Sequence, residues 1–197
     1  MRTSVPEGFT FDAEAIAIGA SAGGIDALLV LLGGLQRAAP PVIVVLHLPQ
    51  HHESRLVQVF AQRLAVPVRE ALPRAPAEPG TVWFAPPGYH LLVEKDRSFS
   101  LSCDEPVLFS RPSIDVLLES CAEAYGRALM GVVLTGANED GARGLAAVKA
   151  CGGLAVVQDP QEAQHRTMPE AAIRTADPDF VLSLAALRGL LHTVGQR

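Results

Sequence analysis

Short apolar runs alternate with segments of helical periodicity along this chain of 197 residues, and that alternation limits its fold more than any other feature. The first unit runs from a β-branched stretch at residues 15–18, through a glycine-rich turn at 19–24, to apolar residues at helical spacing over 25–35. The strands expected after it are 42–46, 66–68, 130–134, 154–157 and 180–182, and the expected helices are 56–64, 113–127, 141–150, 169–175 and 184–194.

Strands that alternate with helices predict an α/β fold, with a doubly wound, mostly parallel sheet and helices on both faces. The run at 42–46 shows no polar alternation, which is typical of a parallel strand covered on both sides. Residues 81–101 differ, because short β-rich runs joined by turns predict a small antiparallel hairpin region or sheet edge there. The length fits one domain. We place it at residues 13–197, behind a flexible arm at residues 1–12.

Charge and hydropathy exclude several classes of function. The net charge is −5 and no cluster of Lys and Arg occurs, so we expect no nucleic-acid partner. The longest apolar run, 27–35, is far shorter than the roughly 20 residues of a membrane helix. Residues 1–14 lack the apolar core of a signal peptide. We therefore expect a cytoplasmic protein without direct membrane insertion.

Cysteine and histidine spacing argues against a metal site. Cys103, Cys121 and Cys151 are far apart and form no C-x-x-C pair, which indicates neither a disulfide framework nor a zinc knuckle. We expect all three to be buried free thiols. His51 and His52 are adjacent, so they do not converge on one ion from a regular element, and we expect them to be solvated loop residues. No metal and no organic cofactor is predicted.

Three polar residues follow three separate predicted strands, and this placement carries the functional argument. In a doubly wound fold, catalytic groups gather at the carboxyl ends of the strands. Ser21, His47 and Asp140 each lie just past such an end. A serine, a histidine and an aspartate that meet in space can act as nucleophile, general base and orienting acid, whatever their order in the chain.

Each of these residues also has a structural alternative. Ser21 lies in a Gly-x-Ser-x-Gly segment at 19–23, whose small neighbours allow a sharp turn that exposes the hydroxyl at a helix N-terminus. Alternatively, Ser21 and Asp140 can cap helices, and His47 can be a hydrogen-bonded structural histidine. Glu139 competes with Asp140 as the acid because it is adjacent.

Taken together, these segments resemble the chemotaxis protein-glutamate methylesterase (CheB) family. Residues 18–24 resemble its nucleophile segment, 47–49 its histidine segment and 134–142 its aspartate segment. The likeness extends from about residue 16 to about residue 191 in the family's order. Further matching segments are 85–90, 111–115, 158–160 and 168–169.

The resemblance implies an enzyme that hydrolyses γ-glutamyl methyl esters on chemoreceptors or receptor-like proteins in signal transduction, and many members also deamidate receptor glutamines. It implies Ser21 as nucleophile, His47 as base and Asp140 as orienter. By the same likeness, the backbone N–H groups of Ala22 and Ala137 are oxyanion donors.

This chain departs from the family in two respects. The family often has Met-Gly where this chain has Ala137-Asn138, which is expected to change substrate fit. The first motif begins by residue 16, so the usual N-terminal phosphoacceptor receiver domain is missing from this sequence. Two alternatives follow from this departure: the activity is unregulated, or a separate regulatory protein controls it.

Three other functions compete with this hypothesis. A small-molecule esterase of the α/β-hydrolase kind is disfavoured, because its usual chain order is Ser, Asp, His. A nucleotide-binding domain is disfavoured because the G-x-G-x-x-G spacing and the P-loop lysine are absent from the glycine turn. A non-catalytic scaffold stays open, although all three triad residue types are present.

Overall fold

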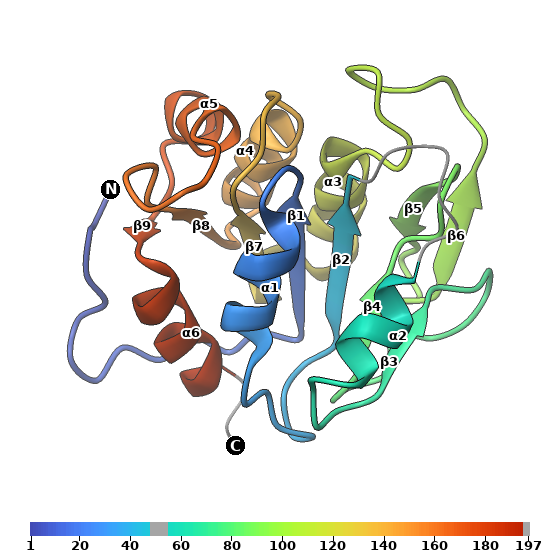
Figure 1. Cartoon of the computed structure of the whole chain (residues 1–197), viewed down its shortest axis with the longest axis horizontal. Helices are drawn as coiled ribbons and strands as arrows, with labels where there is room; N and C mark the ends of the chain where they lie inside the picture. The colour runs from blue at the N-terminus through green and yellow to red at the C-terminus, as the bar shows by residue number, and fades with distance from the viewer. Residues whose placement is uncertain (48–54, 195–197) are drawn as a thin grey trace.

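The chain forms a central sheet with helices on both faces (Figure 1). The computed structural model describes residues 1–47 and 55–194. Within those residues, the main sheet has seven strands in the order β3-β4-β2-β1-β7-β8-β9, and every neighbouring pair is parallel. The strands are β1 (Ala15–Ala20), β2 (Val42–Leu46), β3 (Val68–Glu70), β4 (Val82–Phe84), β7 (Leu129–Val133), β8 (Leu154–Gln158) and β9 (Phe180–Leu182).

Two groups of helices cover the two faces. The helices α1, α2 and α6 lie in front of the sheet in Figure 1, and α3, α4 and α5 lie behind it. Alternate β1 residues divide between two hydrophobic cores, with Ile16 and Ile18 in the front core and Ala15 and Ala17 in the rear one. The doubly wound α/β prediction is thus confirmed. The helices are α1 (Gly24–Leu32), α2 (Leu56–Ala61), α3 (Ile114–Tyr125), α4 (Ala142–Ala150), α5 (Thr167–Ala176) and α6 (Leu184–Thr193), and a 3₁₀ turn follows α3 at Gly126–Ala128.

The strand order reverses direction at β1. This central strand pairs with β2 on one side and with β7 on the other. Strands β2, β3 and β4 lie on one side of β1, and the later strands β7, β8 and β9 lie on the other. Ligand sites in open α/β sheets lie at such a switch point, outside the carboxyl ends of the strands.

The predicted hairpin region is confirmed in part. Strands β5 (His90–Val93) and β6 (Phe99–Ser102) form a separate antiparallel pair. Residues 82–84, which the sequence grouped with that region, form β4 instead, a parallel strand between β2 and β3. The reason is long-range pairing, because β4 is too short for its own pattern to show which strand it joins.

The N-terminal residues run beside the edge strand β9. The backbone N–H of Val181 donates to the carbonyl of Arg2, and the ring of Phe9 meets the ring of Phe180 edge-on at 5.2 Å. Flexibility of residues 1–12 and the domain boundary at residue 13 stay predictions. No helix among the described residues is long and apolar enough to cross a membrane.

The prediction of three buried thiols is wrong for two of them. Cys121 is buried in α3, and its burial raises the pKa of the thiol. Cys103 and Cys151 are exposed. Both follow the end of a regular element, Cys103 after β6 and Cys151 after α4, and at such ends the chain turns into solvent.

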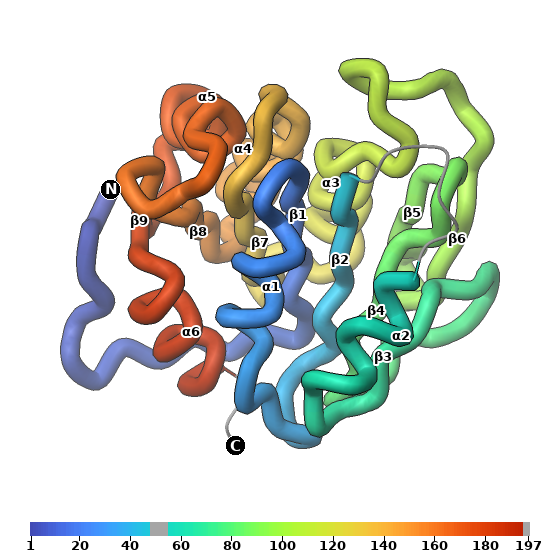
Figure 2. The backbone as a smooth tube through the Cα atoms, viewed as in Figure 1, coloured from blue at the N-terminus to red at the C-terminus, as the bar shows by residue number. Residues whose placement is uncertain are grey.

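The loop between β6 and α3 stands beyond the upper ends of β1 and β2 (Figure 2). Val107 and Ser110 exchange backbone hydrogen bonds of 3.1 and 2.8 Å around a two-residue turn. Both central residues of the turn are left-handed, Leu108 at φ 48° and Phe109 at φ 63°. For side chains other than glycine, this conformation costs about 1–2 kcal/mol per residue.

Candidate active site

Ser21 lies directly beyond β1 in the turn that starts α1. Its backbone N–H donates to the carbonyl of Thr135, at 3.0 Å, and its own carbonyl accepts from the N–H of Gly24, at 2.8 Å. The N-cap of α1 is Gly23, at φ 77°, and no side chain caps the helix. The alternative in which the Ser21 hydroxyl caps α1 is therefore wrong, and the hydroxyl is not used to hold the helix.

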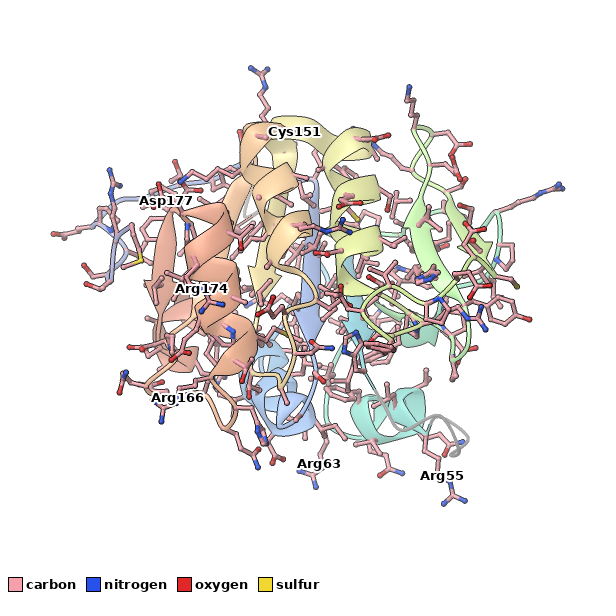
Figure 3. The ribbon with its side chains drawn as sticks, turned by 90° about the horizontal axis from the view of Figure 1, so that it is seen from above. Arg55, Arg63, Cys151, Arg166, Arg174 and Asp177 are labelled. Carbon is pink, nitrogen blue, oxygen red and sulfur yellow. The ribbon has the colours of Figure 1, made fainter. Side chains whose placement is uncertain are left out.

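Ser21 and His47 line one cleft with a volume of about 340 Å³. The turn over residues 21–24 forms one wall and Leu46 and His47 form another. Gln164 lines the cleft from the segment before α5. Figure 3, seen from above, marks the course of that helix by Arg166 at its start and Asp177 just past its end. No hydrogen bond joins the Ser21 hydroxyl to His47 within the described structure, and such bonds often tighten only when substrate binds.

His47 is held by a carboxylate at one ring nitrogen and is unpartnered at the other. Its Nε2 lies 2.9 Å from Oδ2 of Asp140, and its backbone N–H donates to the carbonyl of Ala20, at 3.0 Å. In the part of the chain that the structure describes, Nδ1 is buried and has no hydrogen-bond partner. A neutral imidazole that donates from Nε2 carries its lone pair on Nδ1, so Nδ1 is the atom that can accept a proton.

Asp140 is fully buried at the start of α3. Its carboxylate accepts hydrogen bonds from the Ser113 hydroxyl, at 2.9 Å, and from the backbone N–H groups of Ile114 and Asp115, at 2.7 and 2.9 Å. Burial raises the pKa of this carboxyl, but the hydrogen bonds from His47 and from the first turn of α3 outweigh it and hold the pKa below its usual value. An ionised Asp140 stabilises the imidazolium that forms when His47 takes a proton.

A second buried carboxylate reciprocates this arrangement. Asp115, in the first turn of α3, accepts from the backbone N–H groups of Gly141 and Gly144 at 2.9 and 2.8 Å, which start α4. Its other oxygen accepts from Arg143, at 3.0 Å. Asp140, just before α4, thus caps α3, while Asp115, inside α3, caps α4. The starts of the two helices are locked to each other beside the site.

The two expected oxyanion donors, Ala22 and Ala137, both have unpaired backbone N–H groups among the described residues. Ala22 follows Ser21 and lines the cleft, while its carbonyl accepts from the Thr135 hydroxyl at 2.9 Å. Ala137 is exposed in the loop after β7. Among the described residues, neither backbone N–H donates to a protein acceptor. Each is therefore available to a ligand.

Glu139 and the adjacent histidines are not part of the site that the structure describes. Glu139, the rival acid, is exposed and forms a surface ion pair with Arg174 at 3.7 Å, so it does not approach His47. His51 and His52 lie outside the described residues. Within residues 1–47 and 55–194, no group of His, Cys, Asp and Glu could hold a metal ion.

The chain is similar to known proteins over most of its length. A family model described as CheB methylesterase matches residues 16–191. The chain belongs to the CheB methylesterase family. The crystal structure of the Thermotoga maritima CheB methylesterase catalytic domain superposes with a TM-score of 0.87 at 28% sequence identity, covering 93% of this chain and 100% of that one.

Two relatives of this CheB methylesterase chain differ in length. A putative protein-glutamate methylesterase/protein-glutamine glutaminase of Leptospira interrogans is 45% identical, over 93% of this chain and 95% of its own length. Protein-glutamate methylesterase/protein-glutamine glutaminase 1 of Hahella chejuensis is 37% identical, over 86% of this chain and 48% of its own length. The match thus spans nearly all of one relative and about half of the other.

Sequence reasoning missed the residues that support the CheB site. In the sequence, Ser113 and Asp115 stand out only as part of a matching segment. The same is true of buried Gln158, whose side-chain carbonyl accepts from the Thr135 N–H at 2.8 Å. A serine followed by an acidic residue at a helix start is a recognisable capping signal. That signal indicates a cap, but it cannot show that the cap partner comes from a distant loop.

Proposed function

We propose that this chain hydrolyses glutamyl γ-methyl esters of proteins through Ser21, His47 and Asp140. The observation that carries the proposal is the state of His47. The Nε2 atom of His47 is held by the buried carboxylate of Asp140, whose pKa is lowered. The Nδ1 atom of His47 has no partner, and His47 lines the same cleft as Ser21. An orienting carboxylate and an unpartnered ring nitrogen are two of the features that a general base needs.

In the proposed mechanism, Nδ1 of His47 takes the proton of the Ser21 hydroxyl as its oxygen attacks the ester carbonyl carbon. The N–H groups of Ala22 and Ala137 donate to the resulting oxyanion, and one such donor contributes about 3 kcal/mol to transition-state stabilisation. The tetrahedral intermediate collapses, and methanol leaves with the proton from His47. His47 then activates a water molecule that releases glutamate from the acyl-enzyme.

The same site can deamidate glutamine. An amide carbonyl occupies the position of the ester carbonyl, and His47 protonates the leaving nitrogen so that ammonia departs. The acyl-enzyme formed is identical, because both substrates give a glutamyl ester of Ser21. The relatives from Leptospira interrogans and Hahella chejuensis carry both activities in their names.

The substrate that fits is a methylated chemoreceptor or a receptor-like protein in the cytoplasm. Members of the CheB family act on methylated receptors, and the cleft is open at the molecular surface rather than enclosed.

The direct test is methanol release from methylated receptor fragments, comparing wild type with Ser21→Ala. We expect release by the wild type and a loss of at least about 10³-fold in the variant, because removal of a nucleophile leaves only binding and oxyanion stabilisation. Ser183→Ala is the matched control. It removes a serine hydroxyl that accepts from the N–H of Ala186 at the start of α6. Equal release by wild type and Ser21→Ala would refute the proposed function.

A further inference from the structure

The loop between β6 and α3 contains an exposed apolar turn, which consists of Leu108 and Phe109. Phe109 is 96% exposed and Leu108 is 49% exposed. Positive φ at both central residues is the requirement of a type I′ turn, for which Asn-Gly is the usual pair. Leucine and phenylalanine at these positions thus destabilise the free protein in two ways, by backbone strain and by exposed apolar surface. Strain of this kind is concentrated at ligand clamps and other functional segments.

The apolar turn is held on a braced loop. Val107 and Ser110 close the turn with two backbone hydrogen bonds. At the base of the loop, the Arg111 guanidinium donates to the carbonyls of Cys103 and Asp104, at 2.8 and 3.0 Å. The backbone that carries the two side chains is therefore held in place, which lowers the backbone entropy lost when a partner binds.

The apolar turn stands on the face of the molecule where the site opens. The loop rises beyond the upper ends of β1 and β2 in Figures 1 and 2. The Ser110 hydroxyl accepts from the Asn138 side-chain amide, at 3.5 Å, and the Asn138 side-chain carbonyl accepts from the Asp140 N–H at 3.2 Å. The turn is thus two side-chain contacts away from the acid of the proposed triad. The loop and the cleft therefore lie at the same end of the sheet, the end that a substrate protein must approach.

We propose that the apolar turn is a docking element for the substrate protein, which packs against apolar residues beside the methylated glutamate. The inference rests on the proposed function, which supplies a protein as the occupant of this face. Aromatic side chains, phenylalanine included, are enriched at the buried centre of protein interfaces. An anionic lipid surface is disfavoured as the occupant, because Asp104 and Glu105 are exposed in the same loop.

The double variant Leu108→Asn/Phe109→Gly tests the proposal. It removes both apolar side chains and installs the pair that the same turn prefers, so the loop keeps its shape and thermal stability does not fall. We expect kcat/KM on a methylated receptor fragment to fall at least about 10-fold, chiefly through KM, as for the loss of an interface anchor. Hydrolysis of a small ester such as nitrophenyl acetate should be unchanged.

Two comparisons separate the possible outcomes. Val30→Gln removes an exposed apolar side chain from α1, where Val30 is 46% exposed, and should leave both activities at the wild-type level. Unchanged kcat/KM on the receptor fragment in the double variant would overturn the docking proposal, and so would an equal loss on both substrates. Binding of the fragment to Ser21→Ala protein, with and without the turn substitutions, tests docking even if the wild type hydrolyses nothing. In that case the proposed function alone fails.

Discussion

Replacement of Asp115 by alanine tests whether the reciprocal caps, Asp140 on α3 and Asp115 on α4, hold Asp140 in place beside His47. The change leaves the backbone N–H groups of Gly141 and Gly144 without their acceptor, and each unsatisfied buried donor costs about 1–3 kcal/mol. We expect the free energy of unfolding to fall by about 2–4 kcal/mol, since the start of α4 can partly rehydrate. For a domain of this size, that corresponds to a fall in Tm of about 4–16 °C.

The same change is expected to lower kcat by about 10- to 100-fold with KM unchanged. Gly141 follows Asp140 directly, so a displaced helix start moves the carboxylate that orients His47, and small misplacements of a catalytic group have effects of this size. Methanol release at saturating and at limiting substrate separates kcat from KM. Thermal unfolding of the same preparations shows that the assayed protein is folded.

Two further variants sharpen this test. Asp115→Asn keeps a carbonyl oxygen that can accept from both N–H groups, and it should retain most of the wild-type kcat while losing the bond from Arg143. Ser183→Ala removes a cap from α6, lowering stability by about 1 kcal/mol with no change in kcat. Wild-type kcat in a folded Asp115→Ala protein would refute the reasoning, as would an Asp115→Asn protein as slow as the alanine variant.

Three other predictions follow from the geometry. Because the folded-state pKa of Asp140 is lowered, its ionisation contributes stability that is present above the unfolded pKa of about 3.9 and is lost as pH falls through the folded value. In urea unfolding between pH 7 and pH 3, the free energy of unfolding of Asp140→Asn should therefore depend less on pH than that of the wild type. Gly19→Ala should lower the free energy of unfolding by about 1–3 kcal/mol, because the added Cβ would lie 2.1 Å from Cγ2 of Ile114, and chemical denaturation measures this loss. Native protein should react with a thiol reagent at its two exposed cysteines, whereas Cys121, buried and with a raised thiol pKa, should react only after unfolding.

The sequence predicted those features that local pattern determines. The run at 42–46 became a buried parallel strand because uninterrupted β-branched residues suit no half-exposed element. The positions of Ser21, His47 and Asp140 at strand ends followed from the same boundaries. Their placement required only that parallel strands share one carboxyl edge.

Features that depend on distant contacts could not be predicted. The backbone partners of Asp115, Gly141 and Gly144, lie at the start of α4, 26 and 29 residues further along the chain, and only the packing of α3 against α4 brings them together. The same holds for His47, because no local signal shows which ring nitrogen faces the carboxylate. The exposure of Cys103 and Cys151 likewise depended on where two connections run over the surface.

The pairing of β2 with β1 continues past the end of both strands. Leu46 pairs with Ala20 as the last rung, and the His47 N–H then donates to the Ala20 carbonyl, directly before Ser21. The separation of the proposed base and nucleophile is therefore inherited from the spacing of the sheet, about 4.8 Å between neighbouring strands. An insertion of one residue in β1 or β2 would turn each following side chain to the opposite face, whereas the connections between elements can lengthen freely over evolution.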